Sequence, residues 1–200
     1  ILDTLRRPLQ TLGPFLDAAL LPGEMRQVLS VLERRVTERL PAAYITQEAW
    51  LGDYRFHVDD RVVVPRSHIA ELIDEGFSAW LPDPDAVSDA LDLCSGSGCL
   101  AILLALAFPA ARVDAVDLSA EALQVARINV EDYGLDDRVM LVQSDLFAGL
   151  AGRRYQLIVS NPPYVDAEGM QDLPPEYRRE PALALLARGE GQLPDLGDPV

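Results

Sequence analysis

The sequence predicts an α/β fold with a doubly wound, mainly parallel sheet. From residue 90 onward, short apolar runs alternate with stretches of helical periodicity, which is typical of parallel strands joined by right-handed crossovers. A Gly- and Ser-rich turn follows the first run, and acidic residues or an Asn-Pro-Pro-Tyr sequence follow the later ones. The carboxyl ends of parallel strands share one rim, so we expect these elements to surround a ligand crevice where the strand order reverses.

The composition fits one domain with a small additional lobe. The chain has 200 residues, of which 49% are hydrophobic, and this suffices for one well-buried core. No apolar run reaches the roughly 20 residues that span a bilayer, and the start of the chain does not resemble a signal peptide. We therefore expect no membrane association and a cytoplasmic location. Because the chain begins with Ile1 rather than Met, we expect the natural N-terminus to lie upstream.

The net charge of −15, from 32 acidic and 17 basic residues, limits the choice of partners. It argues against a surface that neutralises phosphates, so direct nucleic-acid binding is not expected. It suits a basic protein partner, although solubility alone explains it equally well. The Cys and His residues form no cluster with metal-ligand spacing, so we expect no metal and reduced thiols at Cys94 and Cys99. The composition predicts no particular oligomeric state.

Residues 1–41 predict a helical lobe at the N-terminus. Its first helix has apolar residues at helical spacing, namely Leu5, Leu9, Leu12, Phe15, Leu16 and Ala19. Pro22 and Gly23 interrupt this pattern, and a second amphipathic helix over residues 24–40 follows. One face of the second helix carries Met25, Val28, Leu29, Leu32 and Val36. The lobe is either a packing appendage or a substrate-recognition element, and the sequence favours neither.

Residues 42–65 predict a β-hairpin next to the main domain. Strands are expected at residues 44–50, 54–58 and 61–64, because apolar and polar residues alternate around a turn containing Gly52. Residues 69–80 predict a helix that leads into the main domain, residues 66–185. Residues 186–200 are rich in Gly, Pro and Asp and predict an irregular tail.

The Gly-rich turn Asp92-Leu93-Cys94-Ser95-Gly96-Ser97-Gly98 joins a strand-like run to the apolar stretch 99–108. A strand, small-residue turn and helix bring the backbone close to a nucleotide-like ligand and present helix N-terminal N–H groups to it. Cys94 stands where such turns often have Gly, so we expect a negative φ there or a slightly different turn. Asp92 either caps the turn or contacts the ligand.

Further carboxylates follow the next two runs. Asp117 follows residues 112–116, where a carboxylate can accept hydrogen bonds from two ribose hydroxyls. Asp145 lies just beyond the run 139–143. Ser119 predicts the N-cap of a helix that extends to about Tyr133 and stops at Gly134.

Asn161-Pro162-Pro163-Tyr164 follows the run 155–160. The prolines stiffen the loop and lack N–H groups, so the local carbonyls face no competing donors. The Asn161 side-chain oxygen and the Pro162 carbonyl can together accept both hydrogens of a planar –NH₂ group, and Tyr164 can cover its face. The alternative is a proline-stiffened loop without a binding role. If the binding role holds, the crevice lies between residues 94–98 and 161–164.

Together these motifs resemble those of class I S-adenosylmethionine-dependent methyltransferases, over residues 43–185. The Asn-Pro-Pro-Tyr sequence is similar to those of enzymes that methylate a planar exocyclic nitrogen, either protein glutamine or adenine N6 in DNA. The segment 62–73 resembles the glutamine branch. Within it, Pro65-Arg66-Ser67 and residues 172–178 resemble the subfamily acting on large-subunit ribosomal protein three, whereas the release-factor subfamily usually has Pro-Arg-Pro-Asp-Thr-Glu.

The resemblance implies a Rossmann-like fold, S-adenosylmethionine as cofactor and S-adenosylhomocysteine as product. The cofactor-binding residues that it implies are Asp92, Cys94, Ser95, Gly96, Ser97, Gly98, Asp117, Leu118, Asp145, Leu146, Phe147 and Asn161. Asn161, Pro162 and Tyr164 are the implied catalytic residues. The same three residues with Pro163 and Arg66 are the implied substrate contacts, and no general base is expected.

The implied reaction is methylation of a glutamine side-chain nitrogen in a ribosomal protein. Methylation of a release factor, methylation of adenine, and a non-catalytic adenosyl-binding module remain alternatives. Class I methyltransferases continue past Asn-Pro-Pro-Tyr with three strands and two helices that this sequence does not predict. We therefore expect the strand 155–160 to be an uncovered sheet edge, and the sequence to be a fragment or its edge to be covered by another chain.

Overall fold

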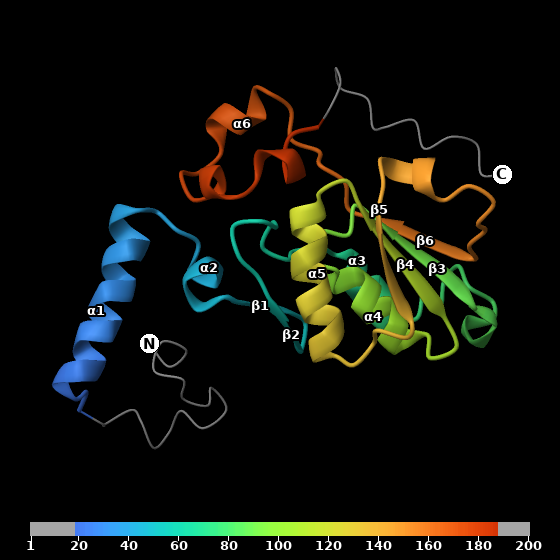
Figure 1. The fold of residues 1–200 in the computed structure, drawn as a ribbon, viewed down its shortest axis with the longest axis horizontal. Helices are drawn as coiled ribbons and strands as arrows, with labels where there is room; N and C mark the ends of the chain where they lie inside the picture. The colour runs from blue at the N-terminus through green and yellow to red at the C-terminus, as the bar shows by residue number, and fades with distance from the viewer. Residues whose placement is uncertain (1–18, 188–200) are drawn as a thin grey trace.

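The computed structural model describes residues 19–187, and a four-stranded parallel sheet forms its centre (Figure 1). Its strands are β3 (Asp89–Leu93), β4 (Arg112–Asp117), β5 (Val139–Gln143) and β6 (Leu157–Ser160). They lie in the order β5-β4-β3-β6, and every neighbouring pair is parallel. The strand order therefore reverses between β3 and β6, and the predicted doubly wound α/β fold is confirmed.

Two helices cover one face of the sheet. They are α4 (Cys99–Ala107) and α5 (Ala120–Asp132), and both contact the strands. The connection from β5 to β6 contains the 3-10 helix η4 (Leu146–Gly149), which packs against the other face. Successive side chains of β3 point to opposite faces of the sheet. Ala90 packs in the core with α4 on one face, whereas Leu91 and Leu93 pack with η4 on the other.

The sequence pattern of each helix matches its burial. In α4, every residue from Cys99 to Ala105 is buried, so the stretch is apolar on all sides. In α5 the buried residues form one face, and the Ala122 N–H donates to Ser119 Oγ at 3.1 Å. Gly134, at φ +63°, follows the C-cap Tyr133. The predicted N-cap, length and stop of α5 are thus confirmed.

The predicted hairpin is confirmed, but its first strand is shorter than expected. β1 (Glu48–Leu51) pairs antiparallel with β2 (Tyr54–His57), and Phe56 of β2 stacks on Tyr133 at 5.6 Å between ring centroids. The expected start at residue 44 is wrong, because residues 42–46 form α2 (Ala42–Thr46). The Tyr44 side chain is buried there, and its hydroxyl donates to the Val62 carbonyl at 2.5 Å. The expected strand at 61–64 is also wrong, because these residues join no sheet.

The helices α1 (Pro22–Thr37) and α3 (Ile69–Asp74) also depart from their predicted limits. Pro22 occupies the first turn of α1, which suits a residue that has no N–H to donate. On the predicted apolar face of α1 only Val28 is buried. The prediction extended α3 to residue 80, but the helix ends at Asp74 because Gly76 and Phe77 have positive φ. The first predicted helix, at residues 5–19, lies almost entirely outside the described residues.

After β6 the chain returns across the molecule as short helical turns. These are α6 (Gly169–Asp172), η5 (Tyr177–Arg179) and η6 (Ala182–Ala184), and a further 3-10 turn, η3 (Pro84–Ala86), precedes β3. Residues 174–187, here called the covering segment, appear in orange and red above α5 in Figure 1. A parallel bridge joins Val165 to Leu186, so the segment runs beside the residue that follows Tyr164.

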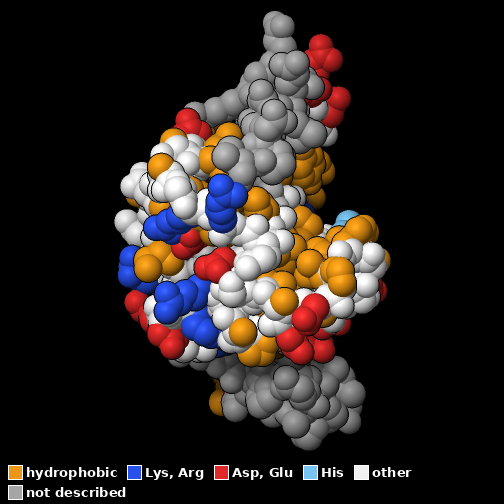
Figure 2. All heavy atoms as spheres, turned by 90° about the vertical axis from the view of Figure 1, so that its right-hand side faces the viewer, with side chains coloured by type: hydrophobic (Ala, Val, Ile, Leu, Met, Phe, Trp, Pro, Cys, Tyr) orange, Lys and Arg blue, Asp and Glu red, His pale blue; other side chains and the backbone are white. Residues whose placement is uncertain are grey.

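β6 is one of the two edge strands of the sheet formed by the described residues, and its Ile158 is 48% exposed. Figure 2 looks onto the side of the molecule where this edge lies in Figure 1. Hydrophobic side chains gather there near the centre, with basic side chains to their left. Among residues 19–187, no helix combines the length and the apolar character that a membrane crossing requires.

Candidate active site

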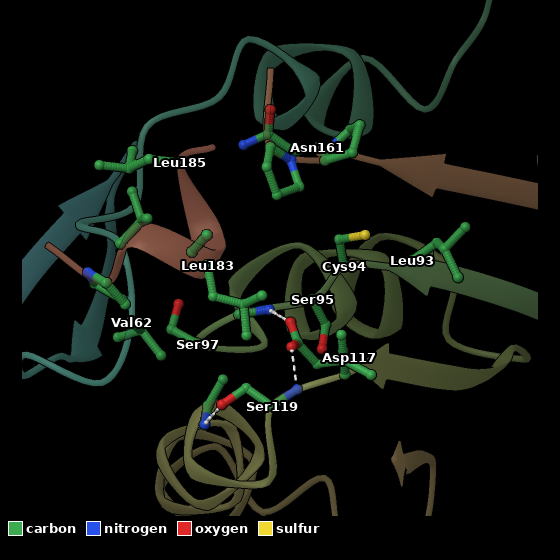
Figure 3. Close-up of a pocket in the computed structure, with 18 of the residues that line it drawn as sticks. Val62, Leu93, Cys94, Ser95, Ser97, Asp117, Ser119, Asn161, Leu183 and Leu185 are labelled. Atoms are coloured by element: carbon green, nitrogen blue, oxygen red, sulfur yellow. Dashed lines mark hydrogen bonds between the residues drawn. The ribbon is translucent and has the colours of Figure 1, made fainter. Parts of the chain in front are cut away.

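A cavity of about 260 Å³ lies at the carboxyl ends of the central strands (Figure 3). The turn after β3 and the loop after β6 both line it. These strands are neighbours, with Leu93 opposite Ser160, and the Ser160 hydroxyl donates to the Leu93 carbonyl at 2.8 Å. The two loops therefore border one crevice at the reversal of strand order, as the sequence predicted.

Most of the residues predicted for the site line this cavity. They are Arg66, Cys94, Ser95, Gly96, Ser97, Asp117, Leu118, Asp145, Leu146, Asn161, Pro162, Pro163 and Tyr164. Asp92, Gly98 and Phe147 do not line it. Phe147 packs beside Leu91 and Leu93 on the η4 face of the sheet. The sequence missed two walls of the cavity, residues 61–65 and the residues of the covering segment from Pro181 onward.

Asp117 joins the turn after β3 to the start of α5. Its Oδ2 accepts from the Gly96 N–H at 2.8 Å, and its Oδ1 accepts from the Ser119 N–H at 2.9 Å, as Figure 3 shows. Burial raises the pKa of Asp117, while these backbone donors partly offset the increase. A carboxylate offers about four acceptor positions, so capacity for further donors remains on a group that lines the cavity.

Asp92 lies behind the turn, with 1% of its surface exposed. Its Oδ2 accepts from the Ala101 N–H in the first turn of α4 at 2.9 Å, and its Oδ1 has no partner among the described residues. Burial, with a smaller contribution from the charge of Asp117, raises the pKa of Asp92 to about 7. Of the two interpretations of Asp92, the capping contact is the one present. The buried Ser95 hydroxyl also lacks a partner among the described residues, and Ser95 does line the cavity.

Cys94 has a left-handed backbone, with φ +65°. The expected negative φ is therefore wrong, and the turn keeps a conformation that costs a residue with a side chain roughly 1–2 kcal/mol. Burial raises the pKa of the Cys94 thiol to about 11, so the thiol stays protonated at neutral pH and supplies no thiolate nucleophile.

The two glycines of the turn have different roles. A Cβ at Gly98 would lie 3.0 Å from the Ala126 Cβ of α5, so Gly98 lets the start of α4 approach α5 closely. A Cβ at Gly96 would meet nothing within 4 Å, and Gly96 lines the cavity. Both have positive φ, +76° and +53° respectively. Gly96 thus leaves the backbone open toward a ligand, whereas Gly98 serves helix packing.

Asn161 and Tyr164 are exposed at the cavity, and Tyr164 is 71% exposed. Among the described residues, the Asn161 carboxamide makes no hydrogen bond, so its oxygen and nitrogen are available to a ligand. The adjoining prolines are half-buried and donate no N–H. Figure 3 shows Asn161 across the cavity from Ser97, Asp117 and Ser119.

Asn129 of α5 is a structural residue that the sequence analysis missed. It is 1% exposed, and its amide donates to the Ser97 carbonyl at 2.9 Å and to the His57 carbonyl at 3.0 Å. Its oxygen accepts from the His57 N–H at 2.7 Å. Asn129 therefore ties the hairpin to the Gly-rich turn. The available signal was a polar residue beside Ala126 and Val130 on the buried face of α5.

Both arginines of the cavity wall are already paired with carboxylates. Arg66 donates to Glu180 Oε1 at 3.0 Å and Oε2 at 2.7 Å, and its guanidinium lies 4.5 Å from the Tyr177 ring centroid. Arg61 donates to both oxygens of Asp59. The cavity wall in the described residues therefore offers no unpaired cation to a phosphate. No group of His, Cys, Asp and Glu within residues 19–187 has the arrangement of a metal site.

Comparisons with known proteins agree with this geometry. Residues 70–177 match the family described as methyltransferase small domain. A ribosomal protein uL3 glutamine methyltransferase of Bordetella pertussis (strain Tohama I) is 60% identical over 191 residues, which are 96% of this chain and 64% of that protein. The protein of the same name from Burkholderia pseudomallei (strain K96243) is 56% identical over 198 residues, with the same two coverages. The chain thus spans about 64% of the length of these curated relatives.

A solved structure shows the same fold at low sequence identity. The hMettl16 catalytic domain, in complex with MAT2A 3′UTR hairpin 6, is 15% identical with a TM-score of 0.50, over 84% of this chain and 58% of that one. The family match covers more than half of the 200 residues, and it includes the four strands of the sheet, the Gly-rich turn and Asn-Pro-Pro-Tyr. The chain therefore belongs to the methyltransferase small domain family.

Proposed function

We propose that this chain transfers a methyl group from S-adenosylmethionine to the side-chain amide nitrogen of a glutamine in a ribosomal protein, large-subunit protein three. The observation that carries the proposal is the single cavity bordered by both the Gly-rich turn and Asn161-Pro162. The names of the relatives, uL3 glutamine methyltransferases of 56–60% identity, support the choice of substrate. Residues 66–185 would form the catalytic domain, acting in the cytoplasm.

The residues present fit S-adenosylmethionine. A cavity of about 260 Å³ is close to the lower end, about 300 Å³, of typical small-molecule sites. It contains the Asp117 carboxylate for ribose hydroxyls, and the partnerless Ser95 hydroxyl and the open backbone at Gly96 for the amino-acid part. Asp145 and Leu146 line the cavity where the adenine would lie. The bound sulfonium would supply an electrophilic methyl group, with S-adenosylhomocysteine as product.

The chain's own contribution is to orient and activate a poor nucleophile. An amide nitrogen has its lone pair delocalised into the carbonyl, so it needs alignment and stabilisation of the positive charge that develops on it. In the proposal the Asn161 Oδ1 and the Pro162 carbonyl accept hydrogen bonds from the two N–H groups, and Tyr164 covers the amide face. No base is required before attack, because the methylated nitrogen is cationic and strongly acidic, and it loses one proton to water after the methyl group has moved. The protonated Cys94 thiol supplies none.

A basic protein is a better partner than nucleic acid in this proposal. The net charge is −15, and Arg61 and Arg66 are paired with carboxylates, so the part of the cavity wall formed by residues 19–187 offers no phosphate clamp. Glutamine methylation of a release factor and N6 methylation of adenine in DNA are the alternative activities, and a non-catalytic adenosyl-binding module is the alternative without chemistry.

The test is methyl transfer from labelled S-adenosylmethionine by the full-length protein, with three acceptors in parallel. These are ribosomal protein three, a peptide release factor and duplex DNA containing adenine. We expect label in the ribosomal protein, and loss of that label when its methylated glutamine is changed to alanine. Label in DNA or in the release factor alone would overturn the substrate assignment. Binding of the cofactor without transfer to any acceptor would overturn the activity.

A further inference from the structure

We propose that Arg66 and Glu180 are positioning residues that hold the covering segment, residues 174–187, as the substrate-side wall of the cavity. The inference rests on the proposed function. The resemblance implied that Arg66 contacts the substrate. In this inference Arg66 acts indirectly instead. Its guanidinium is bound by Glu180, and its effect on transfer passes through the segment that Glu180 belongs to.

The Arg66–Glu180 pair has the geometry of a strong, buried interaction. The Glu180 side chain is only 3% exposed, and both of its oxygens accept from the Arg66 fork at 3.0 and 2.7 Å. The Arg66 side chain is 37% exposed, and it also contacts the face of Tyr177, three residues before Glu180. A carboxylate at this depth is unfavourable without its cation, so the position of the covering segment depends on Arg66.

Three further hydrogen bonds fix the same segment. The Val165 N–H donates to the Leu185 carbonyl at 3.0 Å, and the Ala187 N–H donates to the Val165 carbonyl at 2.9 Å. At its other end Glu176 accepts from Arg35 of α1 at 2.9 Å. The segment is thus held by α1, by the loop before α3 and by the residue after Tyr164. Arg66 is the contact in the middle of the segment.

The segment contributes apolar surface to the cavity. Pro181 and residues 183–187 line it. In Figure 3, Leu185 lies on the same side of the cavity as Asn161, whereas Leu183 lies between that side and Ser97. Through Val165 this wall is continuous with Asn161-Pro162-Pro163-Tyr164, where the amide would be held. An apolar wall excludes water there, which strengthens hydrogen bonds to the amide nitrogen. Asp117 lies across the cavity and is bound by Gly96 and Ser119, so its position does not depend on the segment.

The test compares Arg66→Met with a matched control, Arg153→Met, in the full-length protein. Arg153 pairs with Asp114 on β4 and does not line the cavity. In Arg66→Met we expect kcat/KM for the ribosomal protein to fall by about 30-fold or more, with S-adenosylmethionine affinity within about threefold of wild type. Hydrogen exchange at the Val165 and Ala187 amides should accelerate. Arg153→Met should change none of these values.

A double variant separates positioning from loss of the fold. Arg66→Met with Glu180→Leu removes the unpaired buried carboxylate, so the segment should redock and recover at least about fivefold of the lost kcat/KM. Arg66→Lys keeps the charge without the bidentate fork and should lie between wild type and Arg66→Met.

Three results would overturn the inference. The first is unchanged hydrogen exchange at the Val165 and Ala187 amides in Arg66→Met. The second is faster exchange at these amides with unchanged methyl transfer. The third is an affinity for S-adenosylmethionine that falls in parallel with methyl transfer. Wild-type protein that methylates no acceptor would refute the proposed function instead, while the exchange comparison still decides whether Arg66 holds the segment.

Discussion

Asn161 is the residue on which the proposed chemistry depends most directly. Its carboxamide makes no hydrogen bond among the described residues, and it lines the cavity at the end of β6. Asn161→Ala should lower single-turnover methyl transfer by about 100-fold or more, because it removes an acceptor that acts mainly when the nitrogen becomes positive. Cofactor affinity should change little, since Asp117 and the turn after β3 remain. In Asn161→Asp the carboxylate can still accept a hydrogen bond from the glutamine amide, so this variant should keep partial activity. Near wild-type transfer by Asn161→Ala would rule out the acceptor role.

Asp92 leads to a prediction about pH. Its pKa is raised to about 7 in the folded chain, against roughly 3.9 in an unfolded one, so folding favours its protonated form. The stability that it contributes is fully present below about pH 4 and is lost as the pH rises through 7, on the order of 4 kcal/mol in total. Asp92→Asn cannot ionise. Denaturant unfolding from pH 5 to 8 should therefore show its advantage over wild type growing with pH, and parallel curves would contradict this account.

At the scale of elements, the two glycines of the turn should respond differently to alanine. Gly98→Ala adds a methyl group 3.0 Å from Ala126 at a positive φ, so we expect a loss of about 2–5 kcal/mol from backbone strain and overpacking. In Gly96→Ala the added methyl group has open space, so the folding stability should fall only by the cost of the backbone strain, about 1–2 kcal/mol. Because Gly96 lines the cavity, its variant should instead weaken S-adenosylmethionine binding. Unfolding and titration curves for both variants provide the comparison, and equal losses of stability would contradict it.

The sheet and its helices could be predicted because their signals are local. The buried run of β3, the Ser119 cap and the Gly134 stop each specify an element within a few residues. The segment around Tyr44 was predicted as a strand because β-type residues alternate there. Its helix depends instead on a tertiary contact, the Tyr44 hydroxyl donating to the Val62 carbonyl. Local propensity gives no sign of that partner.

For the site, too, local signals could be predicted and distant contacts could not. Residues 94–97, Asp117 and 161–164 could be assigned to one rim, because each follows a strand of a parallel sheet. The roles of Asn129 and Glu180 could not be predicted, because they depend on partners far away in the sequence, His57 and Arg66. Gly98 was assigned to ligand binding, whereas its close neighbour is Ala126, which only the packing of α4 against α5 reveals.

At the scale of the whole molecule, the net charge of −15 predicts how association depends on salt. The rate of association with the proposed substrate, a ribosomal protein expected to be basic, should fall about tenfold between roughly 50 and 500 mM salt, because screening removes long-range attraction. Dissociation should change much less. Stopped-flow mixing at several ionic strengths measures both rates, with duplex DNA as a polyanion that should not bind. A salt-independent association rate would mean that the charge serves solubility alone.

The strand order β5-β4-β3-β6 also has a kinetic consequence. β3, β4 and β5 follow one another along the chain, whereas the pairing of β3 with β6 joins Leu93 to Ser160, and the Arg66–Glu180 contact spans 114 positions. Contacts between residues far apart in the sequence must close a long loop and therefore form late. The unit of β3, β4 and β5 should assemble first and the crevice last. Variants of Arg66 should then accelerate unfolding while leaving the folding rate almost unchanged. During synthesis, the chain would acquire its ligand site only after residue 180 has left the ribosome, well after most of its core has formed.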